Sequence, residues 1–154
     1  MSRLPQQIHV YLYRKNPNGV YEYAIFQRAD NDLWWQGISG GLEEGETIEA
    51  GARREVFEEA GISDNLSMHK LESRSCLPAY IFSPQTQKIW GKDVVVIPMH
   101  FFAIPYDGEI RLSEEHKQFR WLPYDEAEKL VYFHDQKTAL WELNERLIRG
   151  NLIR

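Results

Sequence analysis

Apolar residues recur along this chain with two different periods, one typical of strands and one of helices. Runs rich in β-branched and aromatic residues predict strands at 8–14, 20–27, 33–39, 66–75 and 94–104. The first two flank the turn signal Asn16-Pro17-Asn18-Gly19 and are expected to form a hairpin. Shorter extended segments are expected at 110–112 and 119–122. Pro98 predicts a bulge or an edge position in the 94–104 strand.

A four-residue spacing of apolar residues predicts a helix that ends near residue 60. One stripe of this helix should face a core and consists of Ile48, Ala52, Val56 and Ala60. Thr47 is the expected N-cap, and Gly61 occupies the position of a left-handed C-cap. Before the helix, Gly40, Gly41 and Gly45 predict a glycine loop with tight turns, positive φ angles and close backbone approach to a ligand.

The second half of the chain predicts two further helices. They cover residues 124–130 and 134–149, and Gly150 should end the second one. Segment 77–91 shows no clear period and predicts a hairpin tip or a substrate-side loop. Strands surround two or three helices without βαβ alternation, so the predicted class is α+β. No repeat or linker divides the 154 residues, and we expect a single domain over 1–154.

Composition and charge exclude several classes of partner. The formal net charge is −5 with a pI near 5.6, so we expect no nucleic-acid partner. We expect no signal peptide, and no apolar run is long enough to cross a bilayer. Cys76 is the only cysteine, which excludes an internal disulfide and favours a reducing compartment. We therefore expect a cytoplasmic protein with no membrane partner, as a monomer or a homodimer.

Three glutamates gather on one side of the predicted helix near its C-terminus. Glu55, Glu58 and Glu59 are spaced i, i+3 and i+4. Each like-charge pair at this spacing costs on the order of 0.2–0.5 kcal/mol, and the negative end of the helix dipole adds to that. A hard dication such as Mg²⁺ would reverse these terms. Arg54 could hold a carboxylate in a bidentate fork. The alternative is a solvated acidic face.

The stretch from Gly40 to Ile62 resembles the Nudix box at every defined position. It reads Gly40, five residues, Glu46, seven residues, Arg54-Glu55-Val56, any residue, Glu58-Glu59, any residue, Gly61-Ile62. The resemblance implies a Nudix hydrolase, which splits a diphosphate linkage attached to another moiety with Mg²⁺ or Mn²⁺. It also implies an α/β/α sandwich with a mixed sheet.

The resemblance also assigns roles within the box. Glu55, Glu58 and Glu59 would form the metal and base cluster, with Glu55 or Glu58 as the general base. Arg54 would orient a glutamate, and the carbonyl of Gly40 would be a further metal ligand.

Outside the box, a second segment resembles a known Nudix metal-binding element. A glutamate-histidine pair before an aromatic strand supplies an additional metal-binding glutamate in many Nudix enzymes, and here that residue would be Glu115. The alternative is a solvated turn. His116 could bind the metal, but a lone histidine in a polar turn is more often a surface residue.

Four residues are candidates for substrate binding. Arg28 ends a strand before the box and could bind phosphate oxygens. Because neighbours on a strand alternate faces, one of Trp34 and Trp35 should be in the core and the other should border the ligand. We assign Trp35 and Gln36 to the ligand, since this pair before the box resembles the dihydroneopterin-triphosphate pyrophosphatase group. Tyr80 could stack on a purine.

The resemblance leaves the substrate open. Residues 110–122 look equally like diadenosine tetraphosphate hydrolases, and markers beyond the box conflict, since Pro78 indicates ADP-ribose and Tyr80 indicates dinucleoside polyphosphates. We expect a Mg²⁺-dependent pyrophosphohydrolase that cleaves a nucleoside or pterin triphosphate to monophosphate and diphosphate. The alternatives are a hydrolase of dinucleoside polyphosphates or ADP-ribose, and a non-catalytic Nudix-fold binding module. Such a module would be expected to lose box carboxylates, and here none is lost.

Overall fold

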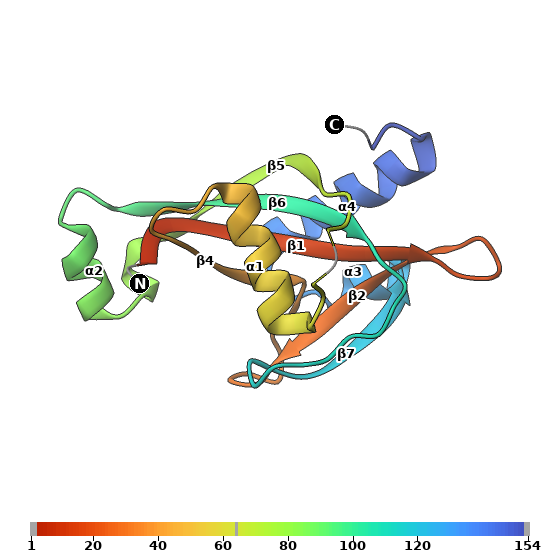
Figure 1. Ribbon diagram of the computed structural model, residues 1–154, viewed down its shortest axis with the longest axis horizontal. Coiled ribbons are helices and arrows are strands. Elements are labelled where there is room, and N and C mark those ends of the chain that lie inside the picture. Colours follow the sequence, from red (N-terminus) through yellow and green to blue (C-terminus); the bar gives the residue numbers. More distant parts are fainter. Residues whose placement is uncertain (1–2, 64, 153–154) are drawn as a thin grey trace.

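The strand-forming segments build one seven-stranded sheet in the computed structural model, which describes residues 3–63 and 65–152. The strands are β1 (Arg3–Lys15), β2 (Tyr21–Arg28), β3 (Trp35–Gln36), β4 (Ile38–Glu43), β5 (His69–Pro78), β6 (Val96–Pro105) and β7 (His116–Pro123). Five of them follow the order β3-β2-β1-β6-β5, while β4 pairs with β1 and β7 pairs with β2 (Figure 1). β1 and β6 are parallel and the other pairs antiparallel, which confirms the α+β class with a mixed sheet.

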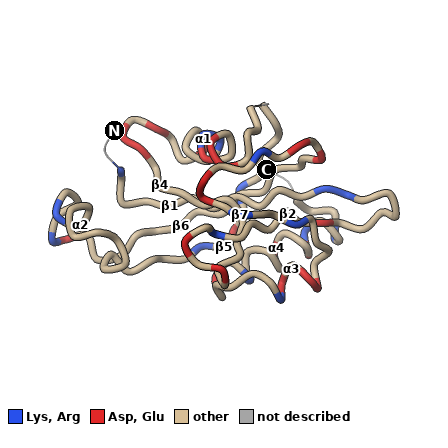
Figure 2. The backbone as a smooth tube through the Cα atoms, turned by 90° about the horizontal axis from the view of Figure 1, so that it is seen from below, with Lys and Arg blue, Asp and Glu red and all other residues tan. Residues whose placement is uncertain are grey.

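Helices cover both faces of this sheet. α1 (Ile48–Ala60) lies on one face, and α3 (Tyr124–Leu130) and α4 (His134–Arg149) lie on the other, as the view in Figure 2 shows. α2 (Pro84–Trp90) stands at one end of the sheet. None of the helices that the structure describes is long and apolar enough to cross a membrane.

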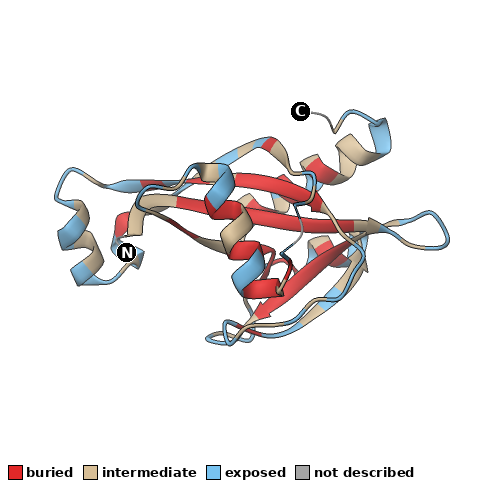
Figure 3. Cartoon of the chain, in the orientation of Figure 1, coloured by how far each residue is buried: buried red, intermediate tan, exposed pale blue. Residues whose placement is uncertain are grey.

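The period of two along β1 creates two cores, one on each face. Ile8, Val10 and Leu12 face α1, whereas Tyr11 and Tyr13 face α4, and all five are buried. Figure 3 shows the buried residues concentrated in the central strands and on the inner side of α1. The sheet therefore carries its hydrophobic side chains on both faces, as a sandwich requires.

The predicted ends and core stripe of α1 are confirmed. Thr47 Oγ1 accepts a hydrogen bond from Ala50 N at 3.1 Å, and Gly61 is left-handed with φ 72°. Ala52, Val56 and Ala60 are buried, and Ile48 packs against the same core. Local sequence is sufficient here because capping and a helical stripe both act within a few residues.

The prediction of a glycine loop is wrong at Gly40 and Gly41. β4 continues through Gly40 and Gly41, which pair with Ile8 and Gln7 of β1. Of the three glycines in this stretch, only Gly45 has a positive φ, 85°. The predicted strand at 33–39 is accordingly divided into β3 and the longer β4.

Segment 77–91 forms the tip of the antiparallel β5–β6 hairpin, as predicted, but it is folded into regular turns and not an irregular loop. β5 runs to Pro78, a 3₁₀ turn covers Ala79–Ile81, and α2 follows. The helix signal is present in the sequence, because Ser83 caps the helix by accepting from Thr86 N at 3.1 Å and Pro84 occupies its first position.

Two smaller expectations have different outcomes. The segment 110–112 is not a strand in the structure. Pairing of β6 with β1 begins at Met99, so Pro98 has a strand neighbour only on the β5 side, at Cys76. Pro98 thus occupies the predicted edge position, where a missing N–H is tolerated.

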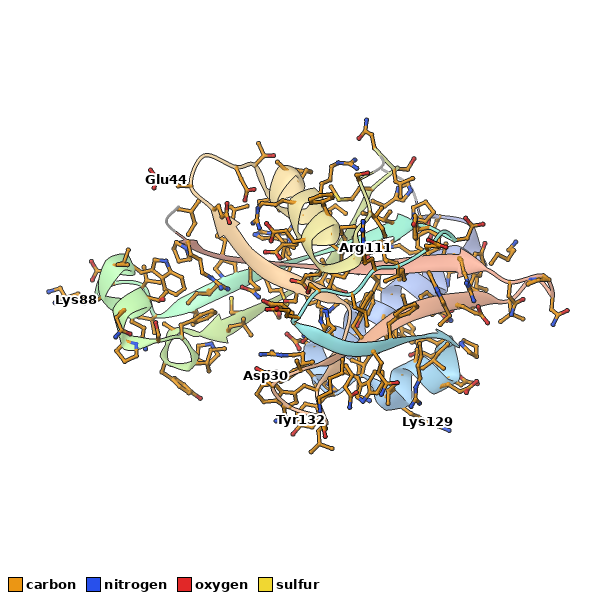
Figure 4. The ribbon with its side chains drawn as sticks, turned by 60° about the horizontal axis from the view of Figure 1, so that its bottom comes forward. Asp30, Glu44, Lys88, Arg111, Lys129 and Tyr132 are labelled. Atoms are coloured by element: carbon orange, nitrogen blue, oxygen red, sulfur yellow. The ribbon has the colours of Figure 1, made fainter. Side chains whose placement is uncertain are left out.

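Replacing Gly61 with alanine should destabilise the fold more than the same change at Gly150. Both glycines end a helix with positive φ, 72° and 69°, so each substitution should cost about 1–2 kcal/mol for a left-handed alanine. A Cβ at Gly61 would also lie 3.0 Å from Arg111 Cβ, whereas Gly150 has open space. Arg111 is labelled beside α1 in Figure 4. Urea unfolding midpoints measure the difference, and equal losses would contradict this packing argument.

Candidate active site

A cavity of about 850 Å³ opens between β4, α1 and the start of α4. Two groups of side chains line it. The acidic group consists of Glu55, Glu59, Glu114 and Glu115, and the aromatic–amide group consists of Trp34, Gln36, Phe133, Asp135 and Gln136. The second group is held together by the backbone, because Tyr132 N donates to Trp35 O at 3.1 Å and so joins β3 to the segment before α4.

Glu55 and Glu59 are buried although both are acids. They lie one helical turn apart on α1, with exposed fractions of 8% and 4%. Burial is the main cause that raises the pKa of each carboxyl above its usual value. The charges of Glu55 and Glu115 raise the pKa of Glu59 further. Ionising both acids is therefore unfavourable in the absence of a positive charge.

Gly40 brings the backbone of β4 against the Glu55 carboxyl group. A Cβ built at Gly40 would lie 2.1 Å from the Glu55 carboxyl carbon, closer than any real contact. The glycine is needed for this approach and not for a turn, since it lies in a regular strand.

Arg54 ties the box together from the outer side of α1. Its Nε donates to Glu46 at 2.6 Å, and its Nη2 donates to the carbonyl of Gly41 at 2.8 Å. Its Nη1 donates to Glu55 at 3.1 Å and to Glu58 at 3.2 Å. The hydrogen bond with Glu46 is the largest cause that raises the pKa of Arg54, so the guanidinium stays charged. Arg54 therefore contacts both glutamates that could serve as the base.

Glu58 does not share the cavity with the other two box glutamates. Its side chain is 50% exposed and turns toward Arg54. Among the described residues, no three acidic, histidine or cysteine side chains converge closely enough to hold a metal ion. The structure thus brings Glu55 and Glu59 together and leaves Glu58 outside, at the Arg54 contact.

The cavity nevertheless has the donor chemistry of a hard-cation site. Glu55 and Glu59 provide two buried carboxyls that a cation would relieve of mutual repulsion, and Glu115 reaches the same cavity. Gly40 adds backbone in contact with Glu55. Carboxylate and carbonyl oxygens are the ligands that Mg²⁺ and Mn²⁺ prefer. These residues therefore fit the divalent metal that the sequence predicts.

The sequence favoured a surface position for His116, but the structure buries it. It begins β7 opposite Arg28 of β2, and its ring packs against Phe26 with centroids 5.1 Å apart. Its Nδ1 lies 3.6 Å from Glu59 Oε1 and has no hydrogen-bond partner in the described part of the chain. Burial lowers the pKa of His116 to about 4, so the ring is neutral at pH 7. The sequence pattern missed this because the inward face of β7 depends on its pairing with β2.

Arg28 and Gln36 line the cavity, as predicted for substrate-binding residues. The Arg28 guanidinium bonds to Asp30 at 2.6 Å and lies 4.7 Å from the Trp34 ring centroid. Asp30 is labelled in Figure 4. Gln36 is 5% exposed and borders the same cavity.

The predictions for Trp35 and Tyr80 differ from the structure, in which Trp34 lines the cavity and neither Trp35 nor Tyr80 does. Trp34 lines the large cavity, whereas Trp35 is 7% exposed, packs in the core and borders a separate hollow of about 380 Å³. Tyr80 is 78% exposed because the 3₁₀ turn directs it outward, and Ile81 and Phe82 line the cavity instead.

Several cavity residues have no sequence signal of their own. Arg3, Phe133, Asp135 and Gln136 come from opposite ends of the chain and have no motif or regular spacing relative to the box. Only the fold brings them together, since β1 pairs with both β4 and β6 and the Tyr11 hydroxyl donates to Gln136 O at 2.8 Å.

Comparison with known proteins places this geometry in a family. The NUDIX domain matches residues 5–141. Bis(5'-nucleosyl)-tetraphosphatase (asymmetrical) of Sus scrofa is 34% identical over 131 residues, covering 85% of this chain and 84% of that protein. RNA pyrophosphohydrolase of Roseobacter denitrificans is 34% identical over 126 residues, covering 75% and 78%. Dihydroneopterin triphosphate diphosphatase of Escherichia coli K12 is 28% identical over 141 residues, covering 88% and 89%.

The solved structures agree with these matches. A Listeria monocytogenes structure assigned to the NUDIX hydrolases is 33% identical, covers 98% of this chain and 99% of its own, and superposes with a TM-score of 0.85. The named relatives differ in substrate, and they share the hydrolysis of a phosphoanhydride linkage. The chain belongs to the Nudix family and is a hydrolase that acts on phosphoanhydride bonds.

Proposed function

We propose that this hydrolase is a Mg²⁺-dependent pyrophosphohydrolase that converts a nucleoside or pterin triphosphate to a monophosphate and diphosphate. The observation that carries the proposal is the composition of one cavity, in which buried carboxyls and a stacking, hydrogen-bonding group face the same space. Carboxylates that hold a cation can bind phosphate groups through that cation. Aromatic rings and amides can bind a planar base by stacking and hydrogen bonding.

The aromatic–amide group has the properties of a base-binding site. The rings of Trp34 and Phe133 both line the cavity, with centroids 5.6 Å apart. Gln36 and Gln136 are 5% and 4% exposed and present amides to the same space. In the described residues Gln136 Oε1 has no hydrogen bond of good geometry, although its side chain interacts with the His9 ring. A buried amide oxygen that lacks a well-formed hydrogen bond favours a ligand that supplies one.

Asp135 favours a base whose edge carries hydrogen-bond donors. It lines the cavity, and its two carboxylate oxygens accept from Ser75 Oγ at 2.7 Å and from Gln136 N at 2.9 Å. A carboxylate can only accept, and each oxygen has a further lone pair. Guanine and pterin rings present a ring N–H beside an amino group, so we favour these bases over adenine.

The cavity size supports one nucleotide and not two. Small-molecule sites usually measure about 300–1,000 Å³, and a cavity of about 850 Å³ falls within that range. A dinucleoside tetraphosphate would have to place its second nucleoside outside. The rival proposal, a dinucleoside polyphosphate hydrolase, is supported by the 34% identity to the Sus scrofa tetraphosphatase.

Glu55 is the general base that this geometry favours. It lies in the cavity, and Arg54 Nη1 orients its carboxylate by a hydrogen bond of 3.1 Å. Glu55 takes a proton from water as the water oxygen bonds to the α-phosphorus, and the bond to the bridging oxygen breaks to release diphosphate. A bound Mg²⁺ would neutralise phosphate oxygens and acidify water.

Hydrolysis in ¹⁸O-labelled water should put the label in the monophosphate. Attack at the α-phosphorus requires this, and mass spectrometry of the products measures it. We also expect kcat/KM for GTP or dihydroneopterin triphosphate to exceed that for diadenosine tetraphosphate. Label in the diphosphate would refute attack at the α-phosphorus. A clear preference for the dinucleotide, or for 5'-triphosphorylated RNA, would transfer the function to the class of the corresponding relative.

Replacing Glu59 with glutamine should abolish turnover and leave the fold intact or slightly more stable. The substitution removes a proposed metal ligand and also relieves its repulsion with Glu55. Measurements are kcat at saturating Mg²⁺ and the urea unfolding midpoint. Glu44→Gln is the matched control, because Glu44 is exposed on the loop before α1 and is labelled in Figure 4. Near-normal kcat for Glu59→Gln would exclude the assignment.

Millimolar Mg²⁺ should raise the melting temperature of the wild-type protein. A cation bound only to the native state stabilises it by mass action, by about 2.7 kcal/mol at a hundredfold excess over Kd. Scanning calorimetry with MgCl₂, and with KCl at matched ionic strength, measures the shift. Glu59→Gln should lose most of it. An equal response to KCl, or in the variant, would count against a carboxylate metal site.

A further inference from the structure

Arg3 carries a guanidinium into the wall of the cavity. Its Nη2 donates to the side-chain oxygen of Gln7, and its Nε is buried with no hydrogen-bond partner among the residues described. A Cβ built at Gly41 would lie 2.4 Å from Arg3 Nε, so the guanidinium lies directly against the backbone of β4. Arg3 thus occupies the strand next to the Gly40–Glu55 contact.

The charge of Arg3 is not matched by a direct ion pair. Glu55 and Glu115 attract it electrostatically, but within residues 3–63 and 65–152 it forms no salt bridge. A partly buried cation without a hydrogen-bonded counter-ion is unfavourable, and a ligand that supplies the missing negative charge removes this cost. A planar guanidinium with a free donor is suited to phosphate oxygens, which accept two parallel hydrogen bonds.

The segment 79–91 braces Arg3 at two points. The Phe82 ring lies under the guanidinium, with Arg3 Cζ 4.9 Å from the ring centroid. The indole N–H of Trp90 donates to the backbone carbonyl of Arg3 at 2.7 Å. The two rings also contact each other edge-to-face, with centroids 5.1 Å apart. Figure 1 shows the N-terminal end of β1 beside α2.

This brace is separate from the packing of the core. α2 has no buried residue of its own, and in Figure 3 it is coloured as intermediate or exposed along its length. α2 thus contacts Arg3 through Trp90, although it does not bury a helix face against the sheet. Because α2 buries no residue of its own but bonds to Arg3 through Trp90, we infer that it positions this arginine.

We propose that Arg3 binds a phosphate group of the substrate, and that Phe82 and Trp90 are positioning residues that hold its guanidinium in the cavity. The proposal rests on the proposed function only for the identity of the anion as part of a triphosphate. The anion site itself stands on the contacts of Arg3. The competing explanation is that Arg3 is an internal counter-ion for Glu55 and Glu115.

Binding of inorganic diphosphate with Mg²⁺ tests the anion site, with isothermal titration calorimetry as the measurement. Arg3→Gln should weaken diphosphate binding by about tenfold or more, since it removes charge-assisted hydrogen bonds. Arg3→Lys should recover part of the loss because it keeps the charge without the fork. Mg²⁺ affinity without diphosphate should change little. Unchanged diphosphate affinity in Arg3→Gln overturns the proposal. An equal change in Mg²⁺ affinity assigns Arg3 to the counter-ion role and also overturns it.

Two variants test the brace without removing the charge. Trp90→Phe deletes the indole donor and keeps an apolar ring, and Phe82→Leu deletes the cation–π contact. Each should raise KM for the triphosphate several-fold while kcat stays within about twofold, since binding and not the chemical step is affected. Lys88→Gln is the control on the same helix, because Lys88 is labelled at its outer side in Figure 4. An unchanged KM in both variants refutes the positioning roles.

The result separates this proposal from the proposed function. If no triphosphate is hydrolysed but Arg3→Gln still loses diphosphate binding, the anion site is supported and the proposed reaction is wrong. If triphosphate is hydrolysed and Arg3→Gln binds diphosphate normally, the reaction is supported and the anion site is wrong. A melting curve of each variant without ligand establishes that it is folded, and Arg3→Lys provides the second test if Arg3→Gln is not.

Discussion

Two carboxyl groups on α1 are held out of water against strand β4, and much of the site is arranged around this burial. Glu55 contacts the backbone at Gly40, where no side chain other than hydrogen fits. Glu59 lies deeper, next to the neutral ring of His116. Burial raises the pKa of both acids, and the neighbouring Glu55 raises that of Glu59 further. The neighbourhood is therefore favourable for a cation and unfavourable for two free charges.

Positive charge is supplied at the edges of this pair and not at its centre. Arg54 holds Glu55 from the outer side of the helix, where Glu46 and the Gly41 carbonyl fix the guanidinium. Arg3 lies against the backbone of β4 at Gly41. Arg54 orients the Glu55 carboxylate through one hydrogen bond, so other carboxylate oxygens remain able to bind a cation.

Local sequence was sufficient for some features and insufficient for others. The caps and buried stripe of α1 were predictable because they depend on residues within one or two turns. Alternation predicted that Trp34 and Trp35 face opposite ways, but not which one faces the ligand. That choice is made by the pairing of Trp35 with Gln27 and its bridge to Val131. His116 is similar, since its inward orientation follows from the β2–β7 register. Arg3 and Gln136 reach the cavity only through long-range packing, which no local pattern contains.

The parallel pairing of β1 with β6 has a consequence for how the protein acquires its site. These strands are far apart in sequence, and a parallel pair cannot be closed by a short hairpin. A folding intermediate containing only the β1–β2 hairpin and α1 would already carry Glu55 and Glu59, yet it would lack the wall supplied by Phe133 and Gln136. The two glutamates would then be present without the aromatic and amide side chains that face them across the cavity. Ligand recognition therefore requires the non-local contacts, and contacts between distant segments are those that slow folding.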